Sequence, residues 1–250
     1  MTGMLLRIRP TANYYILLLA ALLSLAGCGR AINRTAERRI REALPDLLGP
    51  ARQYRAHVDN APERTLRGRL AHVAVDGEDV QLANGLLLDQ LHLDLQGVEV
   101  DTRHGQVRRI QEARFVAVVS AMSLDEFLAG EESEGEPLRQ IRLTLGENRV
   151  TIAGQRVVLG VGVPFQMTGP LRLVGPRRIE IDPTHMTVIG IPLGGAPLRF
   201  LKSRFESAID LSTLPFPVTL TGVQAAAGKL ILSGVADTNA LLRHAEASGP

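Results

Sequence analysis

The sequence is poor in the residue types on which many binding sites depend. Its 250 residues include one cysteine, no tryptophan and only 4% aromatic residues. One cysteine allows no disulfide within the chain, so stability must come from packing. So few aromatic rings leave no platform on which single-stranded nucleic acid could stack. The formal net charge is +2, and removal of residues 1–27 brings it to zero, which argues against nucleic acid as a partner.

Motifs of catalysis and of cofactor binding are also missing. The sequence contains no G-x-S-x-G elbow, no H-E-x-x-H pair, no Walker loop and no complete G-x-G-x-x-G. Its six histidines are dispersed, and the glutamates of residues 131–137 have no fixed geometry for a metal. We therefore expect no enzymatic activity, no cofactor and no metal. A catalytic site assembled from distant residues stays open as an alternative, because triads are defined in space.

The N-terminus has the layout of a secretory signal peptide. Two arginines precede an apolar run over residues 14–25, and Ala26-Gly27 places small residues before Cys28. Residues 25–28, Leu-Ala-Gly-Cys, resemble the bacterial lipobox. This resemblance implies cleavage before Cys28 and acylation of that residue, for example with palmitate, so that residues 1–27 are removed. An ordinary cleaved signal, or an uncleaved anchor with an incidental cysteine, is the alternative.

Acylation would place the protein in the cell envelope, anchored to the membrane and facing the periplasm or the outside. Acyl chains contribute about 0.8 kcal/mol per buried methylene, so two or more hold a protein durably on a bilayer. The predicted partners are therefore the membrane, through this anchor, and phospholipid, for the reasons that follow.

The next part of the chain predicts a helix and then strands. Residues 31–48 carry an apolar stripe at helical spacing, which Pro45 kinks or shortens. In residues 91–101, leucines alternate with polar residues, which is typical of a strand with one buried face. Residues 113–121 are apolar on both faces, so we expect a central strand or one that faces an apolar cavity. A capping-box pattern predicts a short helix from Ser123.

An acidic segment divides the predicted domain into two strand-rich halves. Residues 131–137 lack periodicity and favour a solvated link between about 50–130 and 138–236. Turn signals predict a meander in the second half. Within its strand at residues 157–165, two glycines share one face, which favours strong curvature of the sheet over close approach of a lipid chain or a helix.

The C-terminal part predicts an amphipathic helix and a hairpin. Residues 196–211 place apolar residues on one stripe, and we expect this helix to lie on the inner face of the sheet. A helix in a membrane interface is the alternative. A hairpin is expected over residues 214–236, and residues 237–250 form a tail that starts with one more helical turn.

The order of these elements resembles the LmeA-like phospholipid-binding proteins, a family of the bacterial envelope once listed as a domain of unknown function. The resemblance covers residues 33–236 and is carried by the segments 84–101, 123–128, 149–154, 196–211 and 214–234. It implies one α+β domain over residues 28–236. In this fold, long curved antiparallel sheets wrap against the N-terminal and amphipathic helices, as in tubular lipid-binding proteins. It also implies binding of phospholipid in envelope lipid handling or transport.

A lipid site of this kind is built from the same aliphatic residues as an ordinary core, because burial of an acyl chain needs no precise donor geometry. Core packing is therefore the competing interpretation for each candidate wall residue. The candidates are Phe115, Val116, Val118, Val161, Val163, Phe165, Leu201 and Phe205. Candidate contacts for a phosphate headgroup, with solvated surface as the competing role, are Arg177, Arg178, Arg199 and Lys202.

A non-catalytic structural or adaptor lipoprotein of the envelope is the alternative function. It would hold another component through a sheet edge or the amphipathic helix. It predicts an external apolar patch and a filled interior, whereas lipid binding predicts an internal groove.

Overall fold

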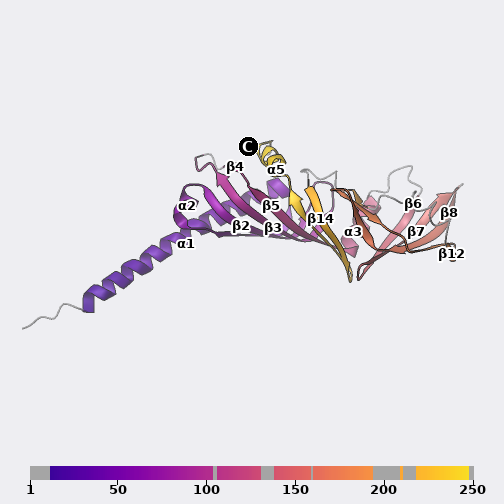
Figure 1. The fold of residues 1–250 in the computed structure, drawn as a ribbon, viewed down its shortest axis with the longest axis horizontal. Helices are drawn as coiled ribbons and strands as arrows, with labels where there is room; N and C mark the ends of the chain where they lie inside the picture. Colours follow the sequence, from indigo (N-terminus) through magenta and orange to yellow (C-terminus); the bar gives the residue numbers. More distant parts are fainter. Residues whose placement is uncertain are drawn as a thin grey trace, which may run out of the picture.

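The computed structural model of the protein describes residues 12–103, 106–130, 138–158, 160–193, 209–210 and 218–247, and it has an elongated α+β fold (Figure 1). The helices are α1 (Ala12–Leu48), α2 (Pro62–Leu66), α3 (Ala121–Gly130) and α5 (Thr238–Ala247). The strands are β1 (Ala51–Asp59), β2 (Arg69–Gln81), β3 (Leu87–Val100), β4 (Val107–Arg109), β5 (Glu112–Ser120), β6 (Leu138–Gly146), β7 (Arg149–Val158), β8 (Val161–Gly169), β9 (Leu171–Val174), β10 (Arg178–Ile181), β11 (His185–Val188), β12 (Ile191–Leu193), β13 (Ile209–Asp210), β14 (Val218–Ala226) and β15 (Lys229–Ala236). The expected combination of antiparallel sheets with an N-terminal helix is confirmed.

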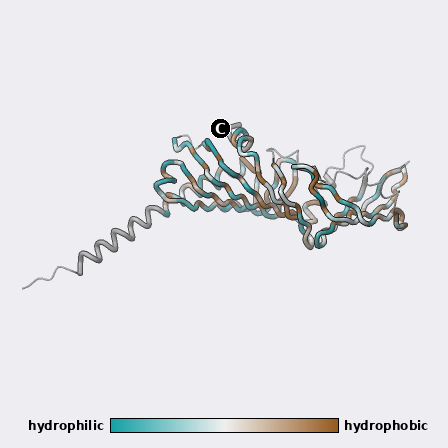
Figure 2. Tube along the Cα trace, in the orientation of Figure 1, coloured by the Kyte–Doolittle hydropathy of each residue, from teal (hydrophilic) through white to brown (hydrophobic). Residues whose placement is uncertain are grey.

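The largest sheet has seven strands and curves around the C-terminal end of α1 (Figure 1). Its strand order is β1-β2-β3-β5-β15-β14, with β4 paired to β3, and each neighbouring pair is antiparallel. Along its strands, hydrophobic and hydrophilic residues alternate (Figure 2). One face is therefore apolar and buried, and the other meets solvent.

Two smaller sheets continue the molecule away from α1. The five-stranded sheet has the order β12-β11-β8-β7-β6, and the three-stranded sheet has the order β13-β10-β9. Both share one continuous core with the large sheet, since fully buried residues of all three, such as Val75, Val150 and Ile179, belong to the same cluster.

The last hairpin crosses the division that the sequence indicates at residues 131–137. Strands β14 and β15 belong by sequence to the second half, yet β15 pairs with β5 of the large sheet. The same hairpin meets the smaller sheets, because Asn148 N donates to Ala225 O at 2.8 Å and Leu220 N donates to Pro176 O at 2.7 Å. The two halves are thus interlocked, and the link at residues 131–137 lies outside the described residues.

α1 is longer than residues 31–48, because its backbone is helical from Ala12 and passes through Cys28 without a break. Leucine and alanine dominate this stretch and are strong helix formers, so the cost of about 1 kcal/mol for each nearby glycine does not end the helix. Pro45 also stays inside the helix. The end comes at Gly49, whose φ of 113° suits glycine and whose N–H donates to Pro45 O at 2.9 Å.

α3 begins two residues before the position that the capping-box pattern indicates. The cap is Ser120, whose Oγ accepts a hydrogen bond from Ser123 N at 3.2 Å. Asp89 supports this turn by accepting from Ser120 N at 2.5 Å and from Ser123 Oγ at 3.4 Å. The predicted start at Ser123 was wrong because the last residue of the preceding strand supplies the cap.

The predicted strand at residues 157–165 is a hairpin. β7 ends at Val158, Gly160 takes a φ of 80° in the turn, and β8 begins at Val161. The first glycine therefore serves a turn and not the curvature of a strand. Of the predicted helix at residues 196–211, the structure describes Ile209 and Asp210, which form β13 against β10. Residues 196–208 and 211 lie outside the described residues.

Candidate functional site

The inner face of the large sheet is built from rows of neighbouring apolar side chains. The strand register places Leu93 beside Phe115, and Phe115 beside Gly234. The next row has Leu91 beside Ala117, and Ala117 beside Leu232. Each row thus contains one small residue, Gly234 or Ala117, beside larger neighbours.

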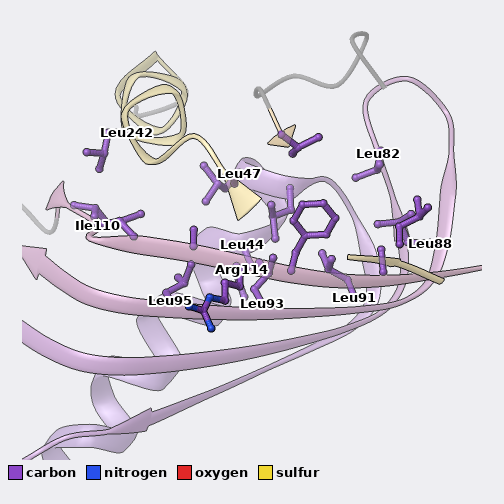
Figure 3. A pocket seen from close by; sticks show the side chains of 18 of the residues that line it. Leu44, Leu47, Leu82, Leu88, Leu91, Leu93, Leu95, Ile110, Arg114 and Leu242 are labelled. Atoms are coloured by element: carbon purple, nitrogen blue, oxygen red, sulfur yellow. The ribbon is translucent and has the colours of Figure 1, made fainter. Parts of the chain in front are cut away.

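Helices lie over this face and enclose a groove. Figure 3 shows Leu44 and Leu47 of α1 and Leu242 of α5 opposite the leucines of β3. The partly open cavity between them has a volume of about 110 Å³, and only apolar atoms face it. We call it the apolar groove. Its lining residues are Leu44, Leu47, Leu48, Leu82, Leu86, Leu88, Leu91, Leu93, Leu95, Val107, Ile110, Ala113, Arg114, Phe115, Ala117, Val218, Leu232, Ala236 and Leu242.

Phe115 owes its place in the wall to a glycine on the adjacent strand. A Cβ built on Gly234 would come within 2.8 Å of the Phe115 ring and 2.5 Å of Thr219 O. Only the absence of a side chain therefore lets the ring lie over β15. The ring occupies the space that a side chain at position 234 would need. It is half-buried beside the cavity.

Tyr54 fixes the end of α1 against the sheet. Its hydroxyl donates to Gly49 O at 2.8 Å, and its ring packs near Gly77, where a Cβ would lie 3.0 Å from the ring. Burial raises the pKa of Tyr54 to about 12, because the phenolate would lose hydration. The turn between α1 and β1 is thus held by a hydrogen bond and by packing, which positions Leu44 and Leu48 in the wall.

The opposite face of the same sheet is polar. His72 Nε2 lies 3.0 Å from Asp94 Oδ2, and His92 Nδ1 lies 2.7 Å from Asp76 Oδ1. The hydrogen bond with His72 is the main reason why the pKa of Asp94 lies below its usual value. These side chains are partly exposed, so the outer face is polar where the inner face is apolar.

The structure places one of the wall residues predicted from the sequence, Phe115, in the apolar groove. Val116 is 41% exposed, and Val118 shares its outward-facing side of β5. Their side chains point away from the groove because alternate residues of a strand face opposite sides. The apolar character of β5 on both faces therefore does not mark both faces as groove wall.

The remaining wall candidates lie elsewhere. Val161 is 66% exposed at the β7–β8 hairpin, and Val163 follows on β8. Phe165 is buried in the five-stranded sheet, where it pairs with Gly154 and Val188. Leu201 and Phe205 lie outside the described residues. None of these three β8 residues lines the apolar groove, which belongs to the large sheet.

Sequence reasoning missed most of the wall. The leucines of β3 carried a usable signal, because Leu91, Leu93 and Leu95 alternate with polar residues and so mark a buried face. The leucines at the end of α1 form an apolar stripe at helical spacing. Neither pattern shows that the helix lies across the sheet, and only that packing creates the groove.

The candidate headgroup contacts have other surroundings. Arg177 Nε donates to the backbone oxygen of Val218 at 3.1 Å, so it joins β14 to the β9–β10 turn. Arg178 is exposed on β10. Arg199 and Lys202 lie outside the described residues.

The size of the apolar groove limits what it holds in this state. A methylene is about the size of a water molecule, whose share of liquid volume is roughly 30 Å³. A cavity of about 110 Å³ thus holds three or four methylenes of an acyl chain. A dry apolar cavity of similar size, about 150 Å³, binds a molecule such as benzene. A whole phospholipid needs a wider groove.

Two further features concern the part of the chain that the structure describes. Within it, no three His, Cys, Asp or Glu side chains gather in a way that could hold a metal ion. No helix in the same part combines the length and the hydropathy that a membrane crossing requires.

Comparison with known proteins gives one match. The model of the LmeA-like phospholipid-binding family matches residues 28–235. This span includes the part of α1 that covers the apolar groove and every strand residue of its lining except Ala236, while Leu242 of α5 lies beyond it. Neither the curated proteins nor the solved structures give a match.

Proposed function

The chain belongs to the LmeA-like phospholipid-binding family, and from this premise we propose that it is a membrane-anchored lipoprotein that takes phospholipid acyl chains into the apolar groove during envelope lipid handling or transport. The observation that carries the proposal is the groove itself. Only apolar atoms face it, and all of its lining residues except Ala236 and Leu242 lie within the residues that the family model matches.

The groove suits hydrocarbon because hydrocarbon binding depends on the apolar surface area buried and not on directional hydrogen bonds. Each buried methylene contributes about 0.8 kcal/mol, and leucine side chains can shift between rotamers to follow a flexible chain. Water binds weakly in such a site, because an apolar wall offers it no hydrogen-bond partners. The expected ligand is therefore an acyl chain whose polar end stays outside the groove.

Entry of a whole chain requires the groove to widen. α5 is the element best suited to move, since it follows the sheet through Asp237 and contributes Leu242 to the wall. Asp237 Oδ1 accepts hydrogen bonds from Asn239 N at 3.0 Å and Ala240 N at 3.1 Å, so the helix has its own cap and can move as a unit.

The proposed anchor is an acyl modification of Cys28, which lies on α1 ahead of the covered sheet. The family match begins at this same residue, which supports a mature chain that starts there. In this arrangement the helix would lead from the membrane to the groove. The proposed role is binding, without a catalytic step.

Native mass spectrometry tests the proposal on the full chain purified from a bacterial host in a non-ionic detergent. We expect a population whose added mass equals that of a phospholipid and which survives exchange into fresh detergent. Fragmentation of the released species identifies the acyl chains. An apoprotein mass alone, with no uptake after incubation with phospholipid vesicles, would contradict the proposal.

A further inference from the structure

A second groove, of about 410 Å³, lies at the end of the large sheet and is lined by arginines. Arg64 comes from α2, Arg67 from the turn after it, Arg69 from β2 and Arg109 from β4. We call this the arginine groove. One acidic residue, Glu99, also lines it, so its formal charge is +3.

These four arginines differ from those arginines of the described residues that form ion pairs. Arg64, Arg67, Arg69 and Arg109 are exposed, and within the described ranges their guanidinium groups form no hydrogen bond or ion pair. By contrast, Arg52 pairs with Glu78 and Asp79, Arg55 with Glu78, and Arg172 with Asp182. Glu99 lies between Arg69 and Arg109 in the strand register but within 4 Å of neither guanidinium group. Four arginines with a single carboxylate among them leave a net positive charge, which favours binding of an anion.

The backbone beneath the arginine groove is held firmly. Thr65 is buried, and its hydroxyl donates to Asn33 Oδ1 on α1 at 2.8 Å while accepting from Asn60 Nδ2 at 2.9 Å. Gly68 takes a φ of 72° and accepts from Val100 N at 2.7 Å. The arginines therefore project from a fixed frame, which reduces the entropy lost when they bind.

The arginine groove lies near the part of α1 that follows the proposed membrane anchor at Cys28. Figure 1 shows α2 and β4 at the end of the sheet from which α1 extends. Asn33, which contacts α2, is five residues after Cys28, or about 7.5 Å along a helix at 1.5 Å per residue. Arg30, Arg34 and Arg38 follow one another at helical spacing on α1 and are exposed. Beside the arginines, Leu66 is 62% exposed.

We propose that the arginine groove binds the phosphate groups of anionic phospholipids at the membrane to which α1 leads. Guanidinium groups donate paired hydrogen bonds to phosphate oxygens, which arginine does better than lysine. Leu66 adds an apolar contact next to the charges, the combination typical of interfacial binding. This inference rests on the proposed function, because it assigns the headgroup side of the same lipid interaction.

The test compares matched variants of the full chain in a non-ionic detergent. The first is R64Q/R67Q/R109Q, and the control is R52Q/R55Q/R172Q, which removes the same charge from arginines that have carboxylate partners. Each is titrated by calorimetry with short-chain phosphatidylglycerol, short-chain phosphatidylcholine and inorganic phosphate. Thermal unfolding checks that the variants are folded. If the triple variant is not, R64Q/R67Q takes its place, since both side chains are exposed.

We expect the first variant to bind phosphatidylglycerol at least about tenfold more weakly, since each cation near an anionic surface contributes appreciably to binding. The control should change less than about twofold. Phosphatidylcholine binding should weaken less than phosphatidylglycerol binding in the first variant, because its choline group cancels the charge of the phosphate. Added salt should weaken phosphatidylglycerol binding to the wild type more than to the first variant.

Three results would overturn the inference. Equal losses in both variants would show that overall charge is responsible and the arginine groove is not. Inorganic phosphate binding as tightly as phosphatidylglycerol would assign the groove to a free anion. Unchanged phosphatidylglycerol binding in the first variant would exclude the groove while the proposed function stands. The proposed function itself fails if the wild type binds neither phospholipid.

Discussion

Filling the apolar groove should separate lipid binding from folding. Ala117 lies on its wall between Leu91 and Leu232 and is 3% exposed. Ala117→Leu adds three carbon atoms, roughly 90 Å³ on the scale of about 30 Å³ per methylene-sized group. The cavity of about 110 Å³ would then be nearly closed in the protein without lipid.

The two expected effects have opposite signs. Cavity volume costs about 24 cal/mol per Å³, so filling most of 110 Å³ should raise the free energy of unfolding by on the order of 2 kcal/mol. Exclusion of three methylenes at about 0.8 kcal/mol each should weaken lipid binding by about 2.4 kcal/mol, or roughly 50-fold. A merely structural cavity would show the first effect without the second.

The assay measures thermal unfolding and uptake of a fluorescent phospholipid from vesicles on the same full-length preparations. Ala74→Leu is the matched control, because Ala74 lies on the outer face of β2 between His57 and Asp94. If packing strain unfolds Ala117→Leu, Ala113→Leu fills the same groove from another position. A folded filling variant that takes up lipid as the wild type does would refute the assignment of the groove.

Three other predictions concern the supports of the groove and the anchor. Burial raises the pKa of Tyr54 to about 12, from about 10 in an unfolded chain. The free energy of unfolding should therefore keep its full value below pH 10 and fall by on the order of 2 kcal/mol between pH 10 and 12. Tyr54→Phe should remove this decline, as measured by urea unfolding at each pH. Ser120→Ala should lower the free energy of unfolding by about 1 kcal/mol through loss of the α3 cap, whereas Ser233→Ala on the outer face should change it little. Cys28→Ser should abolish incorporation of labelled palmitate in a bacterial host, and continued labelling would place the modification elsewhere.

The strand pattern of the large sheet could be read from the sequence because its two faces meet different media. Leu91, Leu93 and Leu95 face the interior, whereas the residues between them, His92 and Asp94, face solvent. Apolar and polar residues therefore alternate in the sequence with a period of two. The helical stripe at the end of α1 and the turn glycines left similar local signals. Each of these depends on neighbours only a few residues apart.

The groove and the position of the last hairpin could not be read in this way. Phe115 and Val116 are both apolar, yet the first lines the groove and the second is 41% exposed, because packing partners distinguish them and composition does not. Pairing of β15 with β5 joins residues more than a hundred positions apart, for example Leu232 with Ala117. No local pattern records such a contact.

The sequence by itself thus determined the α+β class, the apolar faces of β3 and α1, the cysteine at which an anchor is proposed and the resemblance to a phospholipid-binding family. Tertiary structure alone decided that α1 and α5 lie across the large sheet, and that Arg64, Arg67 and Arg109 meet at one end of it. The physical reason is that the spacing of apolar residues depends only on the strand or helix to which they belong. A cavity or a charged groove depends on how separate elements pack, because that packing decides which space stays empty and which charges have no partner.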